Sequence, residues 1–102
     1  GRIAVMCVTL QDKEELSLLP EDSEGIVNFG LEIKGVQAAV LLNEREGLVK
    51  CSLRAKEPLD VAKVAAEFGG GGHVLAAGGS FEKATMEEAR EKIVRALEGI
   101  IR

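Results

Sequence analysis

The sequence predicts an α/β (α+β) fold in which helices pack on a mixed β-sheet, within a single small domain over residues 1–102. Apolar runs typical of strands alternate with amphipathic runs typical of helices. Two of the strand-like runs are joined by a short polar connection with a glycine, residues 43–47, which is typical of a hairpin and argues against an all-parallel sheet. A chain of 102 residues has room for one hydrophobic core.

The first part of the chain predicts a strand, a helix and a second strand. Residues 3–10 form a continuous apolar run, as expected for a strand buried on both faces. A helix is expected from an N-cap at Asp22 or Ser23 to a terminating glycine at Gly35, and residues 36–42 predict the second strand. The helix would bury a face made of Ile26, Phe29 and Ile33.

Residues 48–54 predict the second strand of the hairpin. Apolar and polar side chains alternate there with a period of two, which places Lys50, Ser52 and Arg54 together on one face. The opposite face is expected to join the core.

Two further helices are expected around a glycine-rich stretch. Asp60 can cap a helix whose apolar positions continue to Phe68 and that ends at Gly69. Residues 74–77 fit a short helical turn and residues 79–82 a short strand, although periodicity settles neither.

The last helix is expected to begin at a capping box. The Thr85 hydroxyl can accept from the Glu88 amide while the Glu88 carboxylate reaches back to the Thr85 amide. The inward positions of this helix would be Met86, Ala89, Ile93, Leu97 and Ile100.

Composition excludes several classes of function. The net charge of −4 argues against a broad basic face for long duplex nucleic acid, and the 3% of aromatic residues, without Trp or Tyr, argues against platforms for stacked bases. Cys7 and Cys51 lie in apolar runs and are expected to be buried and reduced, which suits a cytoplasmic protein. No initiator Met, cleavage site or membrane span is recognisable, so we expect a part of a longer chain and no membrane partner.

The sharpest local feature is a run of four glycines, residues 69–72, directly before the single histidine, His73. Glycines can turn successive amide N–H groups toward one point and let a phosphate or a ribose approach the bare backbone. His73 can donate to a phosphoryl oxygen or pair with a sugar or base edge. The alternative is a flexible linker followed by a surface histidine, but linkers usually join domains and this run lies between a capped helix and further apolar sequence.

Arg54 is the second candidate, because a guanidinium suits two phosphate oxygens at once. On the sequence alone, a solvated charged strand face is the better explanation of Arg54. Its position near the carboxyl end of the strand favours a binding role, because open α/β sheets place ligand crevices there. The chain has one His and no nucleophile beside a base, so we predict neither a catalytic residue nor a metal ligand. The sequence therefore indicates a binding domain whose chemistry happens elsewhere.

Ser52-Leu53-Arg54, the helix from Asp60 to Phe68, and the glycine-histidine run continued by Ala76-Ala77-Gly78 together resemble a known family. They closely resemble the DHH-associated domain, first subtype, at the C-terminus of DHH-superfamily phosphoesterases. This superfamily includes RecJ-like exonucleases, the bacterial oligoribonuclease and 3′-phosphoadenosine-5′-phosphate phosphatase, and cyclic dinucleotide phosphodiesterases. Many relatives carry Ser at the position of Ala55.

The resemblance implies a substrate-binding domain of a phosphodiesterase that acts on short oligonucleotides or small nucleotides. Gly70, Gly71, Gly72 and His73 would form the substrate-binding loop and Arg54 would engage phosphate, with Ser52 beside it. A separate N-terminal DHH domain would hold two manganese ions, so this domain alone would bind no cofactor and hydrolyse nothing. The same domain occurs in alanyl-tRNA synthetases, so the alternative is a tRNA-binding or other nucleic-acid-binding appendage.

Overall fold

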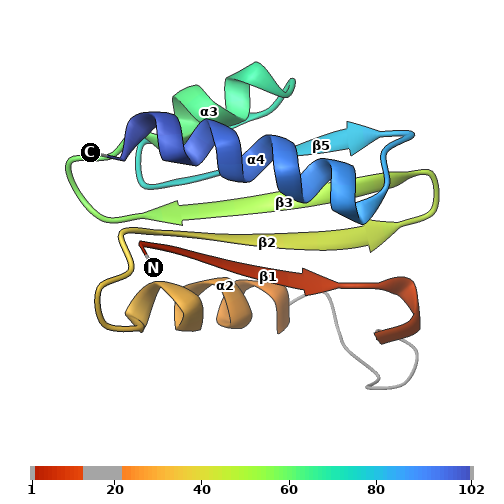
Figure 1. Ribbon diagram of the computed structural model, residues 1–102, viewed down its shortest axis with the longest axis horizontal. Coiled ribbons are helices and arrows are strands. Elements are labelled where there is room, and N and C mark those ends of the chain that lie inside the picture. The colour runs from red at the N-terminus through yellow and green to blue at the C-terminus, as the bar shows by residue number, and fades with distance from the viewer. Residues whose placement is uncertain (1, 13–21, 102) are drawn as a thin grey trace.

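A computed structural model of the chain describes residues 2–12 and 22–101 (Figure 1). Strands and helices follow one another in an order that confirms the predicted α/β class with a mixed sheet. The bounds are β1 (Ile3–Val8), α2 (Asp22–Glu32), β2 (Ala38–Arg45), β3 (Leu48–Ala55), α3 (Val61–Glu67), β4 (Gly71–His73), β5 (Ala76–Glu82) and α4 (Met86–Ile100). None of these helices is long and apolar enough to cross a membrane.

The strands form one five-stranded sheet in the order β1-β2-β3-β5-β4. β1 is parallel to β2, and the other neighbouring pairs are antiparallel. The β2–β3 pair is the predicted hairpin, with Gly47 at φ +77° in its turn. A parallel pair requires a crossover connection, and α2 lies in the connection between β1 and β2.

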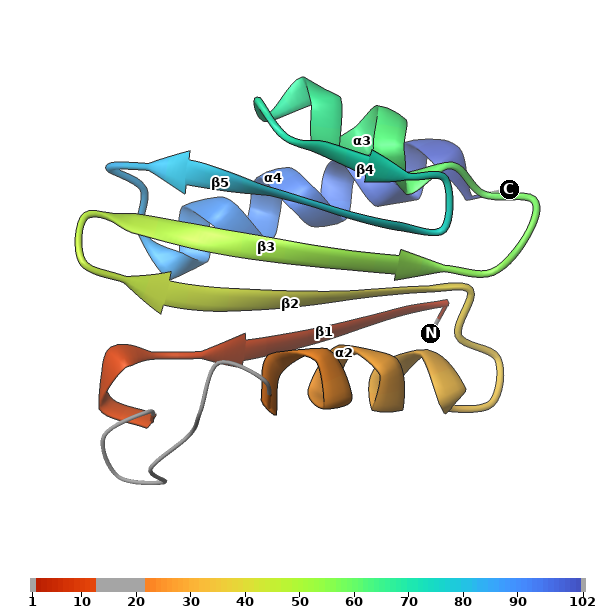
Figure 2. The same ribbon diagram turned by 180° about the vertical axis from the view of Figure 1, so that it is seen from behind.

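Helices pack on both faces of the sheet (Figures 1 and 2). On one face α4 packs on β1 and β2, and α3 packs on β5 and β4. On the other face α2 packs over β1, β2 and β3. In the described part of the chain, this second face has no helix packed over β5 and β4 (Figure 2).

The main core lies between the sheet and the layer of α3 and α4. Phe68 and Phe81, with ring centroids 4.7 Å apart, join α3 to β5. A smaller cluster of Val27, Ala39 and Leu41 lies beneath α2. The largest fully buried side chains of the main core are Val40, Leu42, Val49, Leu53, Val61, Ile93 and Leu97.

The expectation that the first strand is buried on both faces is wrong. β1 lies at the edge of the sheet, so Ile3 to Met6 are only half-buried, whereas Ala38 to Asn43 on the neighbouring strand are buried. Cys7 is exposed for the same reason, contrary to the prediction for this thiol. Cys51 is buried as predicted, and this burial raises the pKa of its thiol.

The predicted inner face of the helix before β2 is wrong for Phe29 and Ile33, whereas Ile26 is half-buried against the smaller cluster. Phe29 and Ile33 of α2 are 67% and 49% exposed, and Val27 is the fully buried residue. Gly30 sets this rotation, because a Cβ on Gly30 would lie 2.6 Å from the Sδ of Met6 on β1. The absence of a side chain at this position lets the helix approach β1 closely. The N-cap predicted at Asp22 or Ser23 involves side chains outside those that the structure describes.

Both predicted helix caps in the second half of the chain are confirmed. Oδ1 of Asp60 accepts from the amides of Ala62 and Lys63, at 3.0 and 3.2 Å. Thr85 and Glu88 form the complete capping box, which lowers the pKa of the Glu88 carboxyl through its hydrogen bonds to Thr85. On α4, Ala89, Ile93 and Leu97 are buried as predicted, while Met86 and Ile100 are half-buried.

Residues 71–82 contain more strand than the periodicity indicates. The predicted helical turn at residues 74–77 is wrong, because Val74 and Leu75 form the turn between β4 and β5. The predicted short strand at residues 79–82 is the second half of the longer β5. The second half of the glycine run, Gly71 and Gly72, enters the sheet with His73 as β4, so these residues form a strand and not a loop.

Replacing Asp60 by Ala tests how strongly this cap holds α3. The Asp60→Ala variant loses the acceptor for two first-turn amides and should lower the free energy of unfolding by about 1 kcal/mol in urea titrations. Asp60→Asn keeps a side-chain acceptor and should lie close to wild type. Equal losses in both variants would mean that the carboxylate charge, and not the hydrogen bonds, is what matters.

Candidate functional site

The glycine run begins as the C-terminal cap of α3. Gly69 adopts φ +75°, its amide donates to the Ala66 carbonyl, and the amide of Gly70 donates to the Ala65 carbonyl at 2.9 Å. These two bonds form a Schellman motif, which requires a left-handed residue at the position of Gly69. The amides of Gly69 and Gly70 are therefore used inside the fold, and the predicted anion nest of successive amides does not include them.

Gly70 and Gly72 are glycines because their backbone lies against β5. A Cβ on Gly70 would overlap the carbonyl oxygen of Gly78 and lie 2.6 Å from the Cα of Gly79. A Cβ on Gly72 would lie 2.7 Å from the Cα of Ala77, and Gly72 also adopts φ +144°. Both residues thus allow β4 to approach β5 more closely than side chains permit.

Gly71 differs from its neighbours, because a Cβ there would meet nothing within 4 Å. Its φ lies outside the left-handed region that Gly69 and Gly72 occupy. Within the described part of the chain, neither packing nor backbone conformation thus requires glycine at residue 71. The bare backbone at Gly71 faces open space, where a ligand can approach it.

His73 is held in place by hydrogen bonds on the turn that follows it. The carbonyl of Val74 accepts from the amide of Val61, the first residue of α3, at 2.8 Å. The carbonyl of Leu75 accepts from the amide of Ala55 at the end of β3, at 3.0 Å. Together with the cap at Gly69, these bonds fix β4 at both ends, and the exposed His73 stands on this anchored segment.

The strand register brings Arg54 and His73 into one row across the sheet. Arg54 of β3 lies opposite Ala76 of β5, and Ala76 lies opposite His73 of β4. Residues directly opposite in an antiparallel pair point to the same face, so both side chains stand on the face not covered by α3 and α4. Two strand spacings separate their backbones by about 10 Å. Figure 2 looks onto this side of the sheet.

A second row lies beside the first and is almost free of side chains. Ser52 lies opposite Gly78, and Gly78 lies opposite Gly71. A Cβ on Gly78 would lie 2.9 Å from the carbonyl oxygen of Cys51. Sequence reasoning selected Ser52 and Gly71 but not Gly78, because only the strand register shows that Gly78 connects them.

We call this surface the open face and define it by the outward residues of β3, β5 and β4. They are Leu48, Lys50, Ser52, Arg54, Ala76, Gly78, Ser80, Glu82, Gly71 and His73. The alternation predicted for β3 is confirmed, since Cys51 and Leu53 are buried and Lys50 is exposed. Ala55 is buried in the main core, so a Ser at this position would point away from the open face.

Among the strand residues that point to this side of the sheet, basic side chains outnumber acidic ones, in contrast to the whole chain. Arg45, Lys50 and Arg54 face this side from β2 and β3, and Glu82 faces it from β5, while the chain carries a net charge of −4. Nη1 of Arg54 donates to the Leu53 carbonyl at 2.9 Å, which keeps the guanidinium close to the sheet. An anion is therefore favoured here even though the domain is acidic.

Among residues 2–12 and 22–101, no group of three His, Cys, Asp or Glu side chains comes together in a way that could hold a metal ion. The described residues therefore do not fit a manganese centre of their own. What the open face offers is a guanidinium, a hydroxyl, an imidazole and bare backbone, which are groups that bind a ligand.

Two glycine replacements should separate packing from ligand access. Gly70→Ala places a methyl group onto the Gly78 carbonyl and should lower the free energy of unfolding by about 1–3 kcal/mol or prevent folding. Gly71→Ala adds the same methyl group in open space and should stay within about 0.5 kcal/mol of wild type. Thermal and urea unfolding measure both, and a strong loss in Gly71→Ala would show that this glycine is needed for the fold itself.

Known proteins with similar sequences or structures are considerably longer than this chain. A curated relative, the bifunctional oligoribonuclease and PAP phosphatase NrnA of Thermus thermophilus, is 34% identical over 77 residues, which is 76% of this chain and 24% of the relative. The crystal structure of an exopolyphosphatase-related protein from Bacteroides fragilis superposes with a TM-score of 0.87 at 38% identity, covering 96% of this chain and 29% of that one. The chain thus spans about a quarter of the length of these relatives.

The same fold occurs as a separate domain. The C-Ala domain of Aquifex aeolicus alanyl-tRNA synthetase superposes with a TM-score of 0.70, covering 95% of this chain and 91% of that chain. At 13% identity this likeness concerns the fold alone. The profile of the DHHA1 domain matches residues 2–102, which is nearly the whole sequence. The chain belongs to the DHHA1 domain family, the family associated with DHH-superfamily phosphoesterases.

Proposed function

We propose that this chain is the substrate-binding domain of a manganese-dependent phosphodiesterase that acts on short oligonucleotides or small nucleotides. The observation that carries the proposal is the row of Arg54, Ala76 and His73 on the open face, with the side-chain-free row of Gly71 and Gly78 beside it. The backbones that carry the group for phosphate and the group for a sugar or base edge lie about 10 Å apart, a distance that one nucleotide can span.

Each residue of the open face has a distinct part in binding. The guanidinium of Arg54 would neutralise a substrate phosphate with paired N–H donors, and the Ser52 hydroxyl would add a hydrogen bond two residues away on the same strand. His73 would hold the other end of the nucleotide. The backbone at Gly71 and Gly72 would lie against the sugar or phosphate, with no Cβ at Gly71 to hinder the approach, and Gly70 keeps that strand close to β5.

The chemical step requires a second domain. We propose that a DHH domain of the same parent protein, N-terminal to this one, holds the manganese ions, which supply the activated water when bound. This chain spans 24% and 29% of the length of two relatives, which leaves room for such a domain in the parent. The open face would then orient the scissile phosphate toward that domain across an interdomain cleft. Both cysteines are free thiols, as expected for a cytoplasmic parent.

A nucleic-acid-binding appendage of the alanyl-tRNA synthetase type is the second candidate. The observation that favours it is the likeness to the C-Ala domain, which has nearly the same extent as this chain. Such an appendage would bind tRNA better than a dinucleotide. The two candidates therefore differ in the ligand that competes best for the open face.

Binding to the isolated chain tests the proposal directly. Titration with a 5′-phosphorylated dinucleotide should shift the amide signals of residues 71–73 and of Arg54. Arg54→Ala and His73→Ala should each weaken binding by about tenfold or more, because each removes a hydrogen bond that involves charge or a fixed ring donor. Arg95→Ala is the matched control, since Arg95 lies on α4 and its guanidinium is 3.9 Å from Glu91.

The outcome that would contradict the proposal is equally specific. Unchanged signals at residues 71–73 with dinucleotide would exclude the open face as its site, and the same signals moving only with tRNA would favour the synthetase-type appendage. Loss of folding in both Arg54→Ala and His73→Ala, measured by thermal unfolding, would make these residues structural.

Gly71→Ala should weaken dinucleotide binding while leaving the fold intact. Its added methyl group projects from β4 into the space that the ligand occupies, and nothing within the described chain opposes it. Gly25→Ala is the matched control, because a Cβ on Gly25 also meets nothing within 4 Å and lies on α2. Calorimetric titration measures both variants, and equal affinities would place the ligand elsewhere on the open face.

A further inference from the structure

We propose that the chain associates with a second copy of itself by pairing the two β1 strands edge to edge, in antiparallel orientation. β1 lies at the edge of the sheet and pairs with β2 on one side only. Its six residues, Ile3–Val8, contain no charged side chain and no proline. Natural edge strands are usually protected by such residues, so an apolar edge of this length indicates a site of association.

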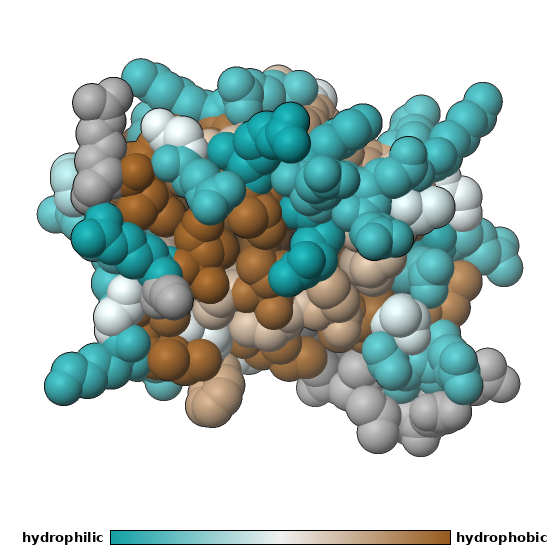
Figure 3. Space-filling model, in the orientation of Figure 1, coloured by the Kyte–Doolittle hydropathy of each residue, from teal (hydrophilic) through white to brown (hydrophobic). Residues whose placement is uncertain are grey.

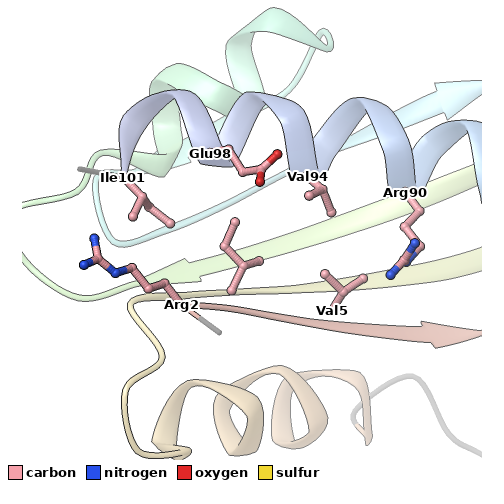
Figure 4. Close-up of a pocket in the computed structure, with 7 residues that line it drawn as sticks. Arg2, Val5, Arg90, Val94, Glu98 and Ile101 are labelled. Atoms are coloured by element: carbon pink, nitrogen blue, oxygen red, sulfur yellow. The ribbon is translucent and has the colours of Figure 1, made fainter.

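A groove of about 500 Å³ runs beside this edge, between β1 and α4 (Figure 4). Its apolar lining consists of Ile3, Val5, Val94 and Ile101. Figure 3 shows apolar residues at the molecular surface between α4 and β1. On this side of the sheet the edge thus has an apolar hollow that a second chain can fill.

The opposite side of the edge carries apolar side chains from α2. Val27 packs with Ala39 and Leu41 of β2, and Gly30 lies against Met6 of β1. Successive residues of an α-helix are about 100° apart around the helix axis. Gly30, Ile33 and Phe29 therefore lie progressively further from Val27, in the same direction around α2. The exposed Ile33 therefore lies on the flank of α2 that faces the β1 edge, whereas the exposed Phe29 lies almost opposite Val27 and points away from the sheet.

A two-fold axis perpendicular to the sheet makes these surfaces complementary. Opposite residues of an antiparallel pair share a face, so Val5 can lie opposite Val5 of the second copy. Because α4 packs on β1 and β2, the two α4 helices would lie about 10 Å apart, the usual distance between packed helices. Ile33 of both copies would lie in the space between the two α2 helices.

Charge complementarity supports a second copy as the occupant. Figure 4 shows Glu98 between Ile101 and Val94 along α4, and Arg90 at the end of the groove near Val5. With Val5 opposite Val5, the two-fold axis brings Arg90 beside Glu98 of the second copy, and this contact occurs twice. Neither Arg90 nor Glu98 forms an ion pair with another residue that the structure describes.

Sedimentation of the chain from micromolar to millimolar concentration tests the association. The chain has a core of its own, and the wild type should convert from monomer to dimer in this range. Arg90→Glu and Glu98→Arg should each weaken the dimer by about tenfold, since each turns two attractive contacts into repulsive ones. The double variant restores opposite charges and should recover wild-type affinity. Lys92→Glu, on α4 but outside this groove, is the control and should change nothing.

A disulfide test measures the strand register. Val5→Cys in a Cys7→Ser background should give a covalent dimer on mild oxidation, because the two Cβ atoms would lie about 5 Å apart. Gly25→Cys in the same background should not.

A chain that remains monomeric throughout overturns the proposal and leaves this edge to another occupant. A dimer that Arg90→Glu does not weaken, or that Val5→Cys does not crosslink, overturns it as well, because association then uses another surface.

Discussion

The close approach of two backbones, β4 against β5, is the constraint on which the site depends. Gly70 and Gly72 lie so near the backbone of β5 that neither has room for a Cβ. This contact adds β4 to the sheet beyond β5. The glycine-rich run thereby forms part of an ordered edge strand. The position of His73 opposite Ala76, and therefore in line with Arg54, follows from that strand pairing. Without the glycines, the imidazole and the guanidinium would not share a face.

The glycines of the run have separate tasks. Gly69 ends α3 in a left-handed conformation, Gly70 and Gly72 permit close packing, and Gly71 leaves the outward surface bare. A flexible linker would have no such division, because none of its positions would be tied to a particular neighbour. The run is therefore an ordered segment, held by backbone hydrogen bonds to α3 at one end and at the turn of Val74 and Leu75 at the other.

Local signals in the sequence were sufficient for the fold class, for the hairpin and for the caps at Asp60 and Thr85. They failed where the outcome depends on distant contacts. The rotation of α2 follows from the contact of Gly30 with Met6, and the exposure of Cys7 follows from the strand order, neither of which periodicity records. The candidate residues could be named from their chemistry, but the row that joins Arg54 to His73 needed the register of β3, β5 and β4.

Arg2 and Ile101, the first and last residues that the structure describes, line the same groove and so lie at one corner of the domain. That corner lies between β1 and α4, on the side of the sheet away from His73. Neighbouring ends make a domain portable: it can be appended to, inserted into or circularly permuted within a larger protein with little rearrangement. A protein of different architecture that acquires this unit would therefore keep the open face turned outward.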